Sequence, residues 1–338
     1  MNQASPDRAP DVSIVVPVFN SSATLAELHR RLAAVMDGLG GTCELVLVDD
    51  ASADESWAGL KRLAARDRRI AALRLAANIG QDKATVLGLA LARGRIVVTL
   101  DDDLQHPPEE IPRLIALLGG AGGADAVLGM QHTRKQTPWR RLLSGLAHVA
   151  ELGLLGKPRW MRFSGFRAMT ASVAAGIVEL RAPLPSVAWL MAEVAPSVVP
   201  LHFPHGASAI GSSRYTLGKL IRSQVAVGRC APRRRLAWLG AASIAIAAAA
   251  LGSAGIAALA LADAGASAGR ILRLAASAIA GLAALAVAAT ALNALADRRR
   301  PRSALGFEFR IAALAGAAER AVARLPRAAA THSPSVRR

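Results

Sequence analysis

The chain has too few cysteine residues to build a disulfide framework or a cysteine-ligated metal site. Only Cys43 and Cys230 occur among the 338 residues, and their spacing matches no metal-binding pattern. This scarcity favours a reduced, cytosolic setting. Aromatic residues are also rare, at 4%, so alanine, leucine and valine supply the apolar part of a sequence that is 53% hydrophobic. Residues 1–10 hold no apolar core, which predicts a flexible N-terminus and no signal peptide.

Two further shortages concern phosphate binding and negative charge. Neither common type of glycine-rich phosphate loop is present, so a bound phosphate would have to be neutralised in another way. Asp and Glu number 24 against 41 Lys and Arg, which gives a formal charge of +17. Such an excess suits nucleic acid, an anionic membrane surface or an acidic substrate. Ten arginines and only two glutamates fall within residues 298–338, so we expect a basic cytosolic tail. Because no nucleic-acid recognition motif occurs, we expect no nucleic-acid partner.

Two long uncharged runs, residues 236–262 and 274–296, precede this tail. Each is long enough to cross the roughly 30 Å of bilayer hydrocarbon as a helix. Arginines stand before the first run and after the second, and basic residues collect on the cytoplasmic side of membranes. We therefore expect two transmembrane helices within residues 236–297, in a multi-pass protein of the inner (cytoplasmic) membrane with both ends in the cytosol. The alternative is an alanine-rich helical hairpin buried in a soluble protein.

The first 130 residues alternate short apolar runs with amphipathic segments. Near-continuous apolar strands separated by helices predict a parallel sheet covered on both faces. A sheet of this class binds its ligands at the carboxyl ends of the strands. The expected strands are Val12–Val18, Glu44–Val48, Ile70–Leu75, Arg95–Leu100 and Ala124–Gly129, and the expected helices cover about residues 23–39, 55–66, 84–92 and 108–118.

Acidic residues cluster at two of these strand ends, Asp49–Asp50 and Asp101–Asp103. On an extended segment Asp101 and Asp103 point the same way and can share one ion, whereas Asp102 points elsewhere. Mg²⁺ and Mn²⁺ favour a few carboxylates together with phosphate oxygens and water. The spacing therefore predicts a divalent-metal and nucleotide site. Helix N-caps at Asp54 and Asp103 are the alternative interpretation.

Several segments together resemble the family 2 glycosyltransferases, which have the GT-A fold. The similarity is greatest to the branch that loads a sugar onto a polyprenyl phosphate, such as dolichyl-phosphate mannose synthases and bacterial undecaprenyl-phosphate glycosyltransferases. It spans about residues 11–225 and rests on Val15–Asn20 (VVPVFN), Val48–Asp54 (VDDASAD), Asn78–Lys83 (NIGQDK), Leu100–Glu110 (LDDDLQHPPEE) and Ser164–Phe166 (SGF). The resemblance implies a Rossmann-like mixed α/β domain with a mainly parallel sheet, followed by the two C-terminal transmembrane helices.

The sequence patterns and the resemblance together predict an order of domains along the chain. The flexible residues 1–10 would precede a cytosolic GT-A catalytic domain at residues 11–212. An amphipathic juxtamembrane helix at residues 213–235, the membrane helices at 236–297 and the tail at 298–338 would follow.

Site residues can be carried over from the family position by position. Asp101 and Asp103, assisted by Gln105, would hold Mg²⁺ or Mn²⁺ on the diphosphate. The acceptor phosphate or the donor diphosphate would be held by Arg214 and by Arg140 or Arg141. Residues expected around the nucleotide sugar are Pro17, Phe19, Asn20, Asp49, Asp50, Gly80, Lys83 and Asp102. Phe19 stands where the family usually has Tyr, and which of Asp49 and Asp50 receives the base or ribose stays open.

The reaction implied is an inverting displacement at the anomeric carbon of a nucleotide sugar, UDP being favoured, by polyprenyl (undecaprenyl) phosphate at the cytoplasmic face. The expected partners are the nucleotide sugar, the polyprenyl phosphate, membrane lipids and further copies of the chain in a homo-oligomer. The alternatives are a family 2 enzyme that acts on another glycolipid or glycan, and a non-catalytic membrane scaffold with the same fold.

Overall fold

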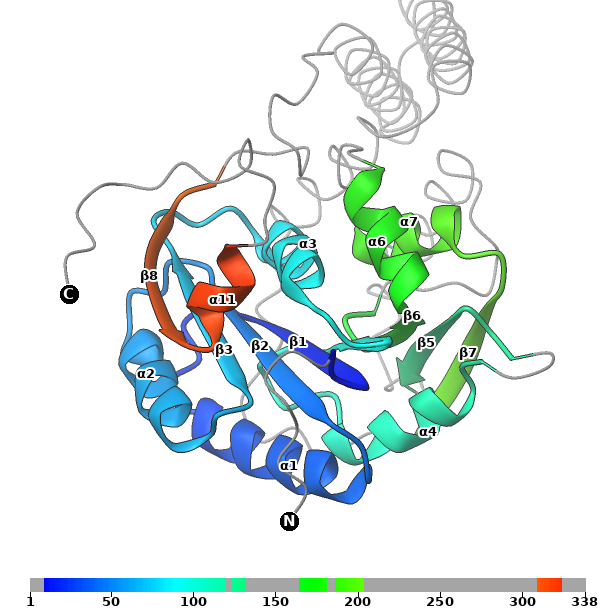
Figure 1. Ribbon diagram of the computed structural model, residues 1–338, viewed down its shortest axis with the longest axis horizontal. Helices are drawn as coiled ribbons and strands as arrows, with labels where there is room; N and C mark the ends of the chain where they lie inside the picture. Colours follow the sequence, from blue (N-terminus) through cyan, green and yellow to red (C-terminus); the bar gives the residue numbers. More distant parts are fainter. Residues whose placement is uncertain (1–8, 120–122, 132–163, 181–185, 204–308, 324–338) are drawn as a thin grey trace, which may run out of the picture. The chain divides into compact units, whose positions relative to one another are not determined.

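A computed structural model of the chain describes residues 9–119, 123–131, 164–180, 186–203 and 309–323. They form an eight-stranded sheet with helices packed on both faces (Figure 1). The strands are β1 (Val12–Val18), β2 (Cys43–Asp49), β3 (Ile70–Leu75), β4 (Ile96–Thr99), β5 (Ala126–Gln131), β6 (Arg167–Thr170), β7 (Val198–Phe203) and β8 (Ile311–Gly316). The helices are α1 (Leu25–Gly38), α2 (Ser56–Arg66), α3 (Gln81–Leu91), α4 (Ile111–Ala116), α6 (Ala171–Glu179), α7 (Val187–Val194) and α11 (Ala318–Val322), with a 3₁₀ turn η1 at Pro108–Glu110.

The strand order is β7-β5-β6-β4-β1-β2-β3-β8. The four neighbours β4, β1, β2 and β3 all run parallel, and β5 pairs parallel with β7. Strand β6 is antiparallel to both of its neighbours, and β8 is antiparallel to β3. The expected mixed α/β architecture with a mainly parallel sheet is thus confirmed.

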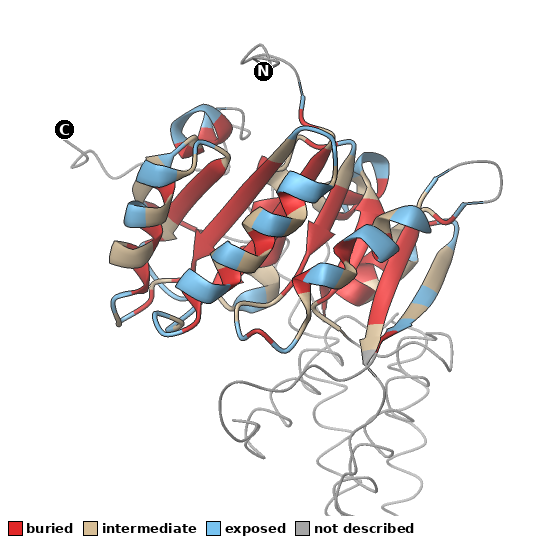
Figure 2. Ribbon diagram, turned by 90° about the horizontal axis from the view of Figure 1, so that it is seen from below, coloured by how far each residue is buried: buried red, intermediate tan, exposed pale blue. Residues whose placement is uncertain are grey.

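Two hydrophobic cores lie on opposite faces of this sheet because side chains alternate along each strand. From β1, Ile14 packs into the core that α1, α2 and α4 cover, whereas Val15 packs into the core under α3, α6, α7 and α11 (Figure 1). Figure 2 shows the central strands buried and the outer faces of the helices exposed. Complete burial of a side chain such as Leu28 or Leu87 stabilises the fold by about 1.5–3 kcal/mol.

The elements agree with the sequence expectations most closely in the parallel part. Strands β1 and β3 have the expected bounds, and β5 starts two residues later than expected. The helix expected over residues 108–118 is shorter and begins as the 3₁₀ turn η1, since Pro112 has no N–H to donate to the carbonyl of Pro108, as an α-helix starting at Pro108 would require. Strands β6 and β7 had no counterpart in the sequence analysis.

Strand β8 corrects the interpretation of residues 298–338 as only a basic tail. Residues Ile311–Gly316 (IAALAG) form the edge strand beside β3, and α11 packs behind them. The run is uncharged and apolar, and its pairing covers the edge of β3 that would otherwise be exposed. The charge excess, counted over all 41 residues, concealed this short segment.

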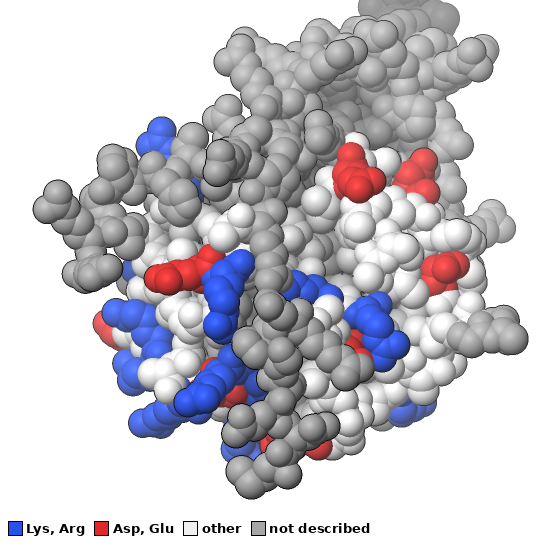
Figure 3. Space-filling model, viewed as in Figure 1, with Lys and Arg blue, Asp and Glu red and all other residues white. Residues whose placement is uncertain are grey.

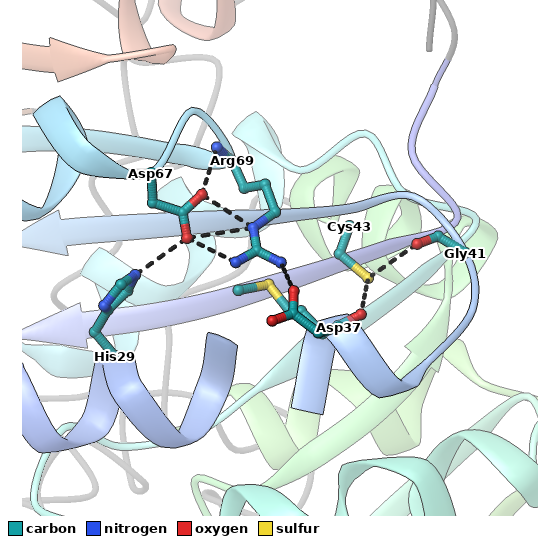
Figure 4. A network of polar contacts seen from close by, with 7 residues as sticks. His29, Asp37, Gly41, Cys43, Asp67 and Arg69 are labelled. Atoms are coloured by element: carbon teal, nitrogen blue, oxygen red, sulfur yellow. Dashed lines mark hydrogen bonds and ion pairs between the residues drawn. The ribbon is translucent and has the colours of Figure 1, made fainter. Parts of the chain in front are cut away.

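A polar network links α1 to the turn before β3, at the sheet edge where β2 and β3 begin (Figure 4). The Arg69 guanidinium donates to the carboxylates of Asp67 and Asp37, and His29 Nε2 lies 3.1 Å from Asp67 Oδ2. Burial would raise the pKa of Asp67, but hydrogen bonds from Arg69 and His29 outweigh it and lower that pKa to about 2. Cys43, at the start of β2, is a free thiol whose pKa is raised by burial. The network therefore serves the fold at the edge opposite the strand carboxyl ends.

Charged side chains of both signs lie close together on the face seen in Figure 3. Ion pairs such as Arg31 with Glu109 and Arg113 with Glu110 join neighbouring helices or turns. Exposed pairs of this kind contribute at most about 1 kcal/mol each.

No helix within the described ranges is long and apolar enough to cross a membrane. The expected spans at 236–262 and 274–296, the expected juxtamembrane helix at 213–235, and Arg140, Arg141 and Arg214 all lie outside the described residues.

Candidate active site

Three loops meet where the parallel strands β1, β2 and β4 end. Because β1 lies between β4 and β2, the loop after β1 (residues 19–24) is flanked by the loops after β2 (residues 50–55) and β4 (residues 100–107). The carboxyl ends of adjacent parallel strands meet at one edge of the sheet. This edge collects most of the site residues expected from the sequence.

The loop after β1 presents one aromatic ring and is tied to the loop after β2. Phe19 is 48% exposed. Asn20 has a φ of 53°, and its side-chain Oδ1 accepts a hydrogen bond from Ala53 N at 2.8 Å. Its own N–H donates to Ser52 Oγ at 2.9 Å. Pro17 is buried within β1 opposite Val48. Of the three residues expected in a base pocket, only Phe19 therefore offers a large exposed side chain.

Asp49 and Asp50 differ sharply in their surroundings. Asp49 is fully buried at the end of β2, where its carboxylate accepts from Ser52 N at 3.1 Å and lies 3.3 Å from Arg74 Nε. The Asp50 carboxylate accepts from the backbone N–H groups of Ile79 and Gly80 at 2.7 and 2.9 Å. Burial raises the pKa of Asp50, and these two hydrogen bonds oppose the rise.

The segment before α3 depends on this Asp50 contact. Gly80 caps α3 with a φ of 95°, a left-handed conformation that favours glycine. Lys83 follows in the first turn of α3. The hydrogen bonds of Asp50 thus fix the segment that carries Gly80 and leads to Lys83.

Asp101 is enclosed by groups from its own loop and from two other segments. Gln81 Nε2 donates to its Oδ1 at 2.6 Å, and His106 Nδ1 lies 3.7 Å from its Oδ2. The backbone of Gly165 is so close that a Cβ there would fall within 3.0 Å of Asp101 Cγ, Oδ1 and Oδ2. Burial raises the pKa of Asp101, an effect that nearby His106 opposes and Asp103 reinforces. The carboxylate is therefore held in one place.

A buried arginine near Asp101, Arg167, was not predicted from the sequence. Arg167 is 6% exposed at the start of β6, where it pairs with Thr99 of β4. Its Nε donates to the Ser164 carbonyl at 2.6 Å, while Nη1 makes no hydrogen bond among the described residues. Burial lowers the pKa of Arg167, and the charges of Asp82 and Asp101 oppose the decrease. Its only signal in the sequence was its position directly after the Ser164–Phe166 motif.

Two further residues beside Asp101 were also missed or set aside. Gln81 lies within the Asn78–Lys83 motif but was not among the expected site residues. His106 lies within the Leu100–Glu110 motif and was likewise not among them, and its ring stacks on Phe166 with the centroids 5.5 Å apart. Both take their positions from contacts between loops that are distant in the sequence.

Asp102 and Asp103 point to different surroundings. The Asp102 carboxylate accepts from Phe19 N at 2.9 Å and from the Ser21 hydroxyl. Burial raises the pKa of Asp102 to about 6, against the opposing effect of these two hydrogen bonds. Asp103 is exposed, and its Oδ1 accepts from Gln105 N at 3.0 Å. Asp102 thus serves the loop after β1, and Asp103 stays open to a ligand.

The oxygen ligands at this edge of the sheet fit a divalent cation such as Mg²⁺ or Mn²⁺. Within the described part of the chain, no three His, Cys, Asp or Glu side chains converge into a closed metal cage. Asp101 and Asp103 instead offer two hard oxygen ligands, of which one is fixed and the other exposed. Mg²⁺ and Mn²⁺ accept such a partial set and complete their shell with water and phosphate oxygens. The residues therefore fit a cation shared with a phosphate-bearing ligand.

Comparison with known proteins identifies relatives of the chain. The chain is 35% identical over 233 residues to the undecaprenyl-phosphate 4-deoxy-4-formamido-L-arabinose transferase of Pseudomonas paraeruginosa, a match that covers 68% of each chain. It is 33% identical over 237 residues to the transferase of the same name from Edwardsiella ictaluri, covering 68% of this chain and 71% of that one. A similar solved structure is glucosyl-3-phosphoglycerate synthase from Mycobacterium tuberculosis in complex with phosphoglyceric acid, with 18% identity, coverage of 65% and 78%, and a TM-score of 0.48. The profile described as "Glycosyl transferase family 2" matches residues 13–175, and the chain belongs to this family.

Proposed function

We propose that the protein is a metal-dependent, inverting glycosyltransferase that moves a sugar from a nucleotide sugar, UDP-linked by preference, to polyprenyl phosphate. The observation that carries the proposal is the pair Asp101 and Asp103 at the sheet edge, one carboxylate fixed by Gln81 and the other exposed. The acceptor follows from the relatives at 35% and 33% identity, which are named as undecaprenyl-phosphate sugar transferases.

The chemistry asks for positioning rather than for a strong base. A polyprenyl phosphate is already anionic at neutral pH, so it can attack the anomeric carbon without losing a proton. A divalent cation on Asp101 and Asp103 would supply positive charge to the departing diphosphate. The remaining task is to bring two anionic partners together, for which we propose Arg214 and Arg140 or Arg141.

The described residues have separate parts in this scheme. Gln81 and the Gly165 backbone hold Asp101 in place, so little reorganisation is needed when a ligand arrives. The exposed ring of Phe19 offers a face on which the nucleobase can stack, an interaction worth about 1–3 kcal/mol in other base-binding proteins. Asp50 orders the segment before α3 through two backbone hydrogen bonds. We propose that Asp49 or Asp50 helps to form the nucleoside site.

We also propose that the enzyme works at the cytoplasmic face of the membrane. Strands β7 and β8 belong to one sheet, and residues 204–308 lie between them. If this segment enters a bilayer, both of its ends lie on the same side, which permits only an even number of crossings. The two uncharged runs at 236–262 and 274–296 satisfy this condition, and the arginines around them favour the cytosol. A lipid-linked acceptor would then meet the catalytic domain at the membrane surface.

A direct assay tests the proposal. Membranes that contain the full chain are incubated with a panel of nucleotide sugars, undecaprenyl phosphate and Mg²⁺ or Mn²⁺, and the lipid product is identified by mass. We expect one sugar to appear on the polyprenyl phosphate, and we expect no product from membranes with the Asp103→Ala variant. Transfer to a different glycolipid or glycan would replace the proposed acceptor. The absence of transfer from every donor to every acceptor would refute the enzymatic function and favour a scaffold.

A further inference from the structure

We propose that Asp102 is a positioning residue that couples the nucleoside-side loop, residues 19–24, to the metal-side loop, residues 101–105. The inference rests on the proposed function, because it assumes a cation on Asp101 and Asp103. It changes the part given to Asp102, which the family resemblance grouped with residues that contact the nucleotide sugar. In the structure the Asp102 carboxylate contacts the protein itself.

Three hydrogen bonds join the two loops at this residue. The carboxylate of Asp102 accepts from Phe19 N at 2.9 Å and from the Ser21 hydroxyl, and its backbone carbonyl accepts from Thr24 Oγ1 at 2.8 Å. Phe19 is the exposed aromatic of the proposed nucleoside side. Asp102 therefore holds the backbone of that aromatic residue from the loop that carries the metal ligands.

The position of Asp102 in the sequence links the two loops through the backbone. It is the residue between Asp101 and Asp103, so a cation that draws those two carboxylates together also fixes the backbone of Asp102. A fixed Asp102 backbone fixes the acceptor for Phe19 N–H and the Ser21 hydroxyl. By thermodynamic reciprocity, an occupied nucleoside side would favour the metal-bound arrangement to the same extent.

Both loops are held in uncommon backbone conformations, so their hydrogen bonds have to maintain them. Asn20 and Leu104 have φ values of 53° and 60°, in the left-handed region that non-glycine residues rarely adopt. Each such conformation costs about 1–3 kcal/mol and persists only where the surroundings determine it. Loops under this constraint have few alternative arrangements, and a change at Asp102 is passed to Phe19 instead of being absorbed.

The test uses Mn²⁺ alone as the probe and needs no knowledge of the sugar. Binding of Mn²⁺ to the purified full chain is measured by electron paramagnetic resonance of the free ion. Hydrogen–deuterium exchange of a peptide covering residues 18–24 is measured with and without saturating Mn²⁺. In the wild-type protein we expect Mn²⁺ to slow exchange at the Phe19 amide about threefold or more. In Asp102→Ala we expect Mn²⁺ to bind with an affinity within about threefold of wild type and to leave that exchange unchanged.

A matched control variant removes a different hydrogen bond to the same loop, residues 19–24. Asp54 accepts from Ser22 N at 3.0 Å and belongs to the loop after β2, away from the proposed metal ligands. Asp54→Ala should raise exchange in the loop but keep the slowing caused by Mn²⁺. Should Asp102→Ala fail to fold, Ser21→Ala replaces it, because this change keeps the hydrogen bond from Phe19 N to Asp102 and removes the hydroxyl that contacts Asp102 and the Phe19 carbonyl, and it should reduce the slowing.

The possible outcomes separate this inference from the proposed function. Equal slowing in wild type and Asp102→Ala, or no slowing in a wild-type protein that binds Mn²⁺, overturns the coupling. Loss of Mn²⁺ binding in Asp102→Ala as severe as in Asp103→Ala also overturns it, since Asp102 would then be a metal ligand. Failure of the wild-type protein to bind Mn²⁺ refutes the metal dependence of the proposed function and the coupling with it.

Discussion

Replacement of Gly165 by alanine should disable the proposed metal site while the fold is retained. The added Cβ would fall within 3.0 Å of Cγ, Oδ1 and Oδ2 of Asp101, a separation that real Cβ atoms essentially never show. Because Gly165 is held by a 2.8 Å hydrogen bond from Thr99 Oγ1 to its carbonyl, the carboxylate has to move rather than the backbone. Restoring ordinary contact would require a shift of the Asp101 carboxylate by about 1 Å.

The size of the effect follows from this displacement. A misplacement of about 1 Å can lower a rate about 10²-fold, which corresponds to about 2.7 kcal/mol of transition-state stabilisation. Overpacking of a tight site costs typically about 1–3 kcal/mol of stability. We therefore expect Gly165→Ala to weaken Mn²⁺ binding and to lower transfer about 100-fold, with a smaller loss of thermal stability.

The assay compares Mn²⁺ affinity, transfer rate and melting temperature with those of Gly59→Ala. A Cβ at Gly59, within α2, would meet Leu25 Cδ1 at 3.6 Å, which is ordinary van der Waals contact. Alanine is favoured over glycine in a helix interior by about 1 kcal/mol, so this control should be neutral or stabilising. If Gly165→Ala bound Mn²⁺ and transferred sugar like wild type, Asp101 could not be a ligand placed by this contact.

Three other predictions concern the metal ligands and the polar network remote from them. Asp103→Ala should abolish transfer while the circular dichroism spectrum and melting temperature stay close to wild type, because Asp103 is exposed; wild-type turnover would disprove its role. Chelation by EDTA should stop transfer and added Mg²⁺ or Mn²⁺ should restore it, whereas full activity in EDTA would contradict the metal dependence. Asp67→Asn should lower the free energy of unfolding by about 2 kcal/mol at pH 7, since the pKa of Asp67 is lowered to about 2 in the folded state. That contribution is present above about pH 4 and is lost as pH falls toward 2, so unfolding experiments should show a weaker acid dependence in the variant, and an unchanged dependence would count against the Arg69 pairing.

The parallel part of the fold was predictable because each strand carries its own signal. The apolar runs of β1 and β3 are bounded by charged or turn-forming residues, and their burial on both faces requires helices on both sides. Strand β6 lacks such a signal, since its four residues include the buried Arg167. Strand β8 is rich in alanine and resembles a helix as much as a strand. Both of these strands are defined by a partner far away in the sequence.

The site was predictable to a similar degree. Alternation along an extended segment predicted that Asp101 and Asp103 face one way and Asp102 another. In the structure β4 ends at Thr99, and Asp102 and Asp103 lie in a turn, so the separate partners of Asp102 arise from the turn and not from strand alternation. Spacing could not reveal that Gln81 and Gly165 enclose Asp101, because these contacts depend on how α3 and β6 pack around β4. The catalytic and binding roles assigned to these residues stay predictions for the assays above.

The three consecutive aspartates raise the question of how so much like charge is tolerated at one strand end. The structure divides the charge among three environments: Asp102 accepts two hydrogen bonds, Asp103 faces solvent, and Asp101 lies near the buried Arg167 and His106. Burial raises the pKa of Asp101, and repulsion from Asp103 adds to that rise, while Asp102 is repelled by both of its neighbours. A divalent cation between the carboxylates of Asp101 and Asp103 would offset their repulsion, whereas a water molecule would not. We therefore predict that a cation bound by Asp101 and Asp103 would relieve part of the repulsion between their carboxylates.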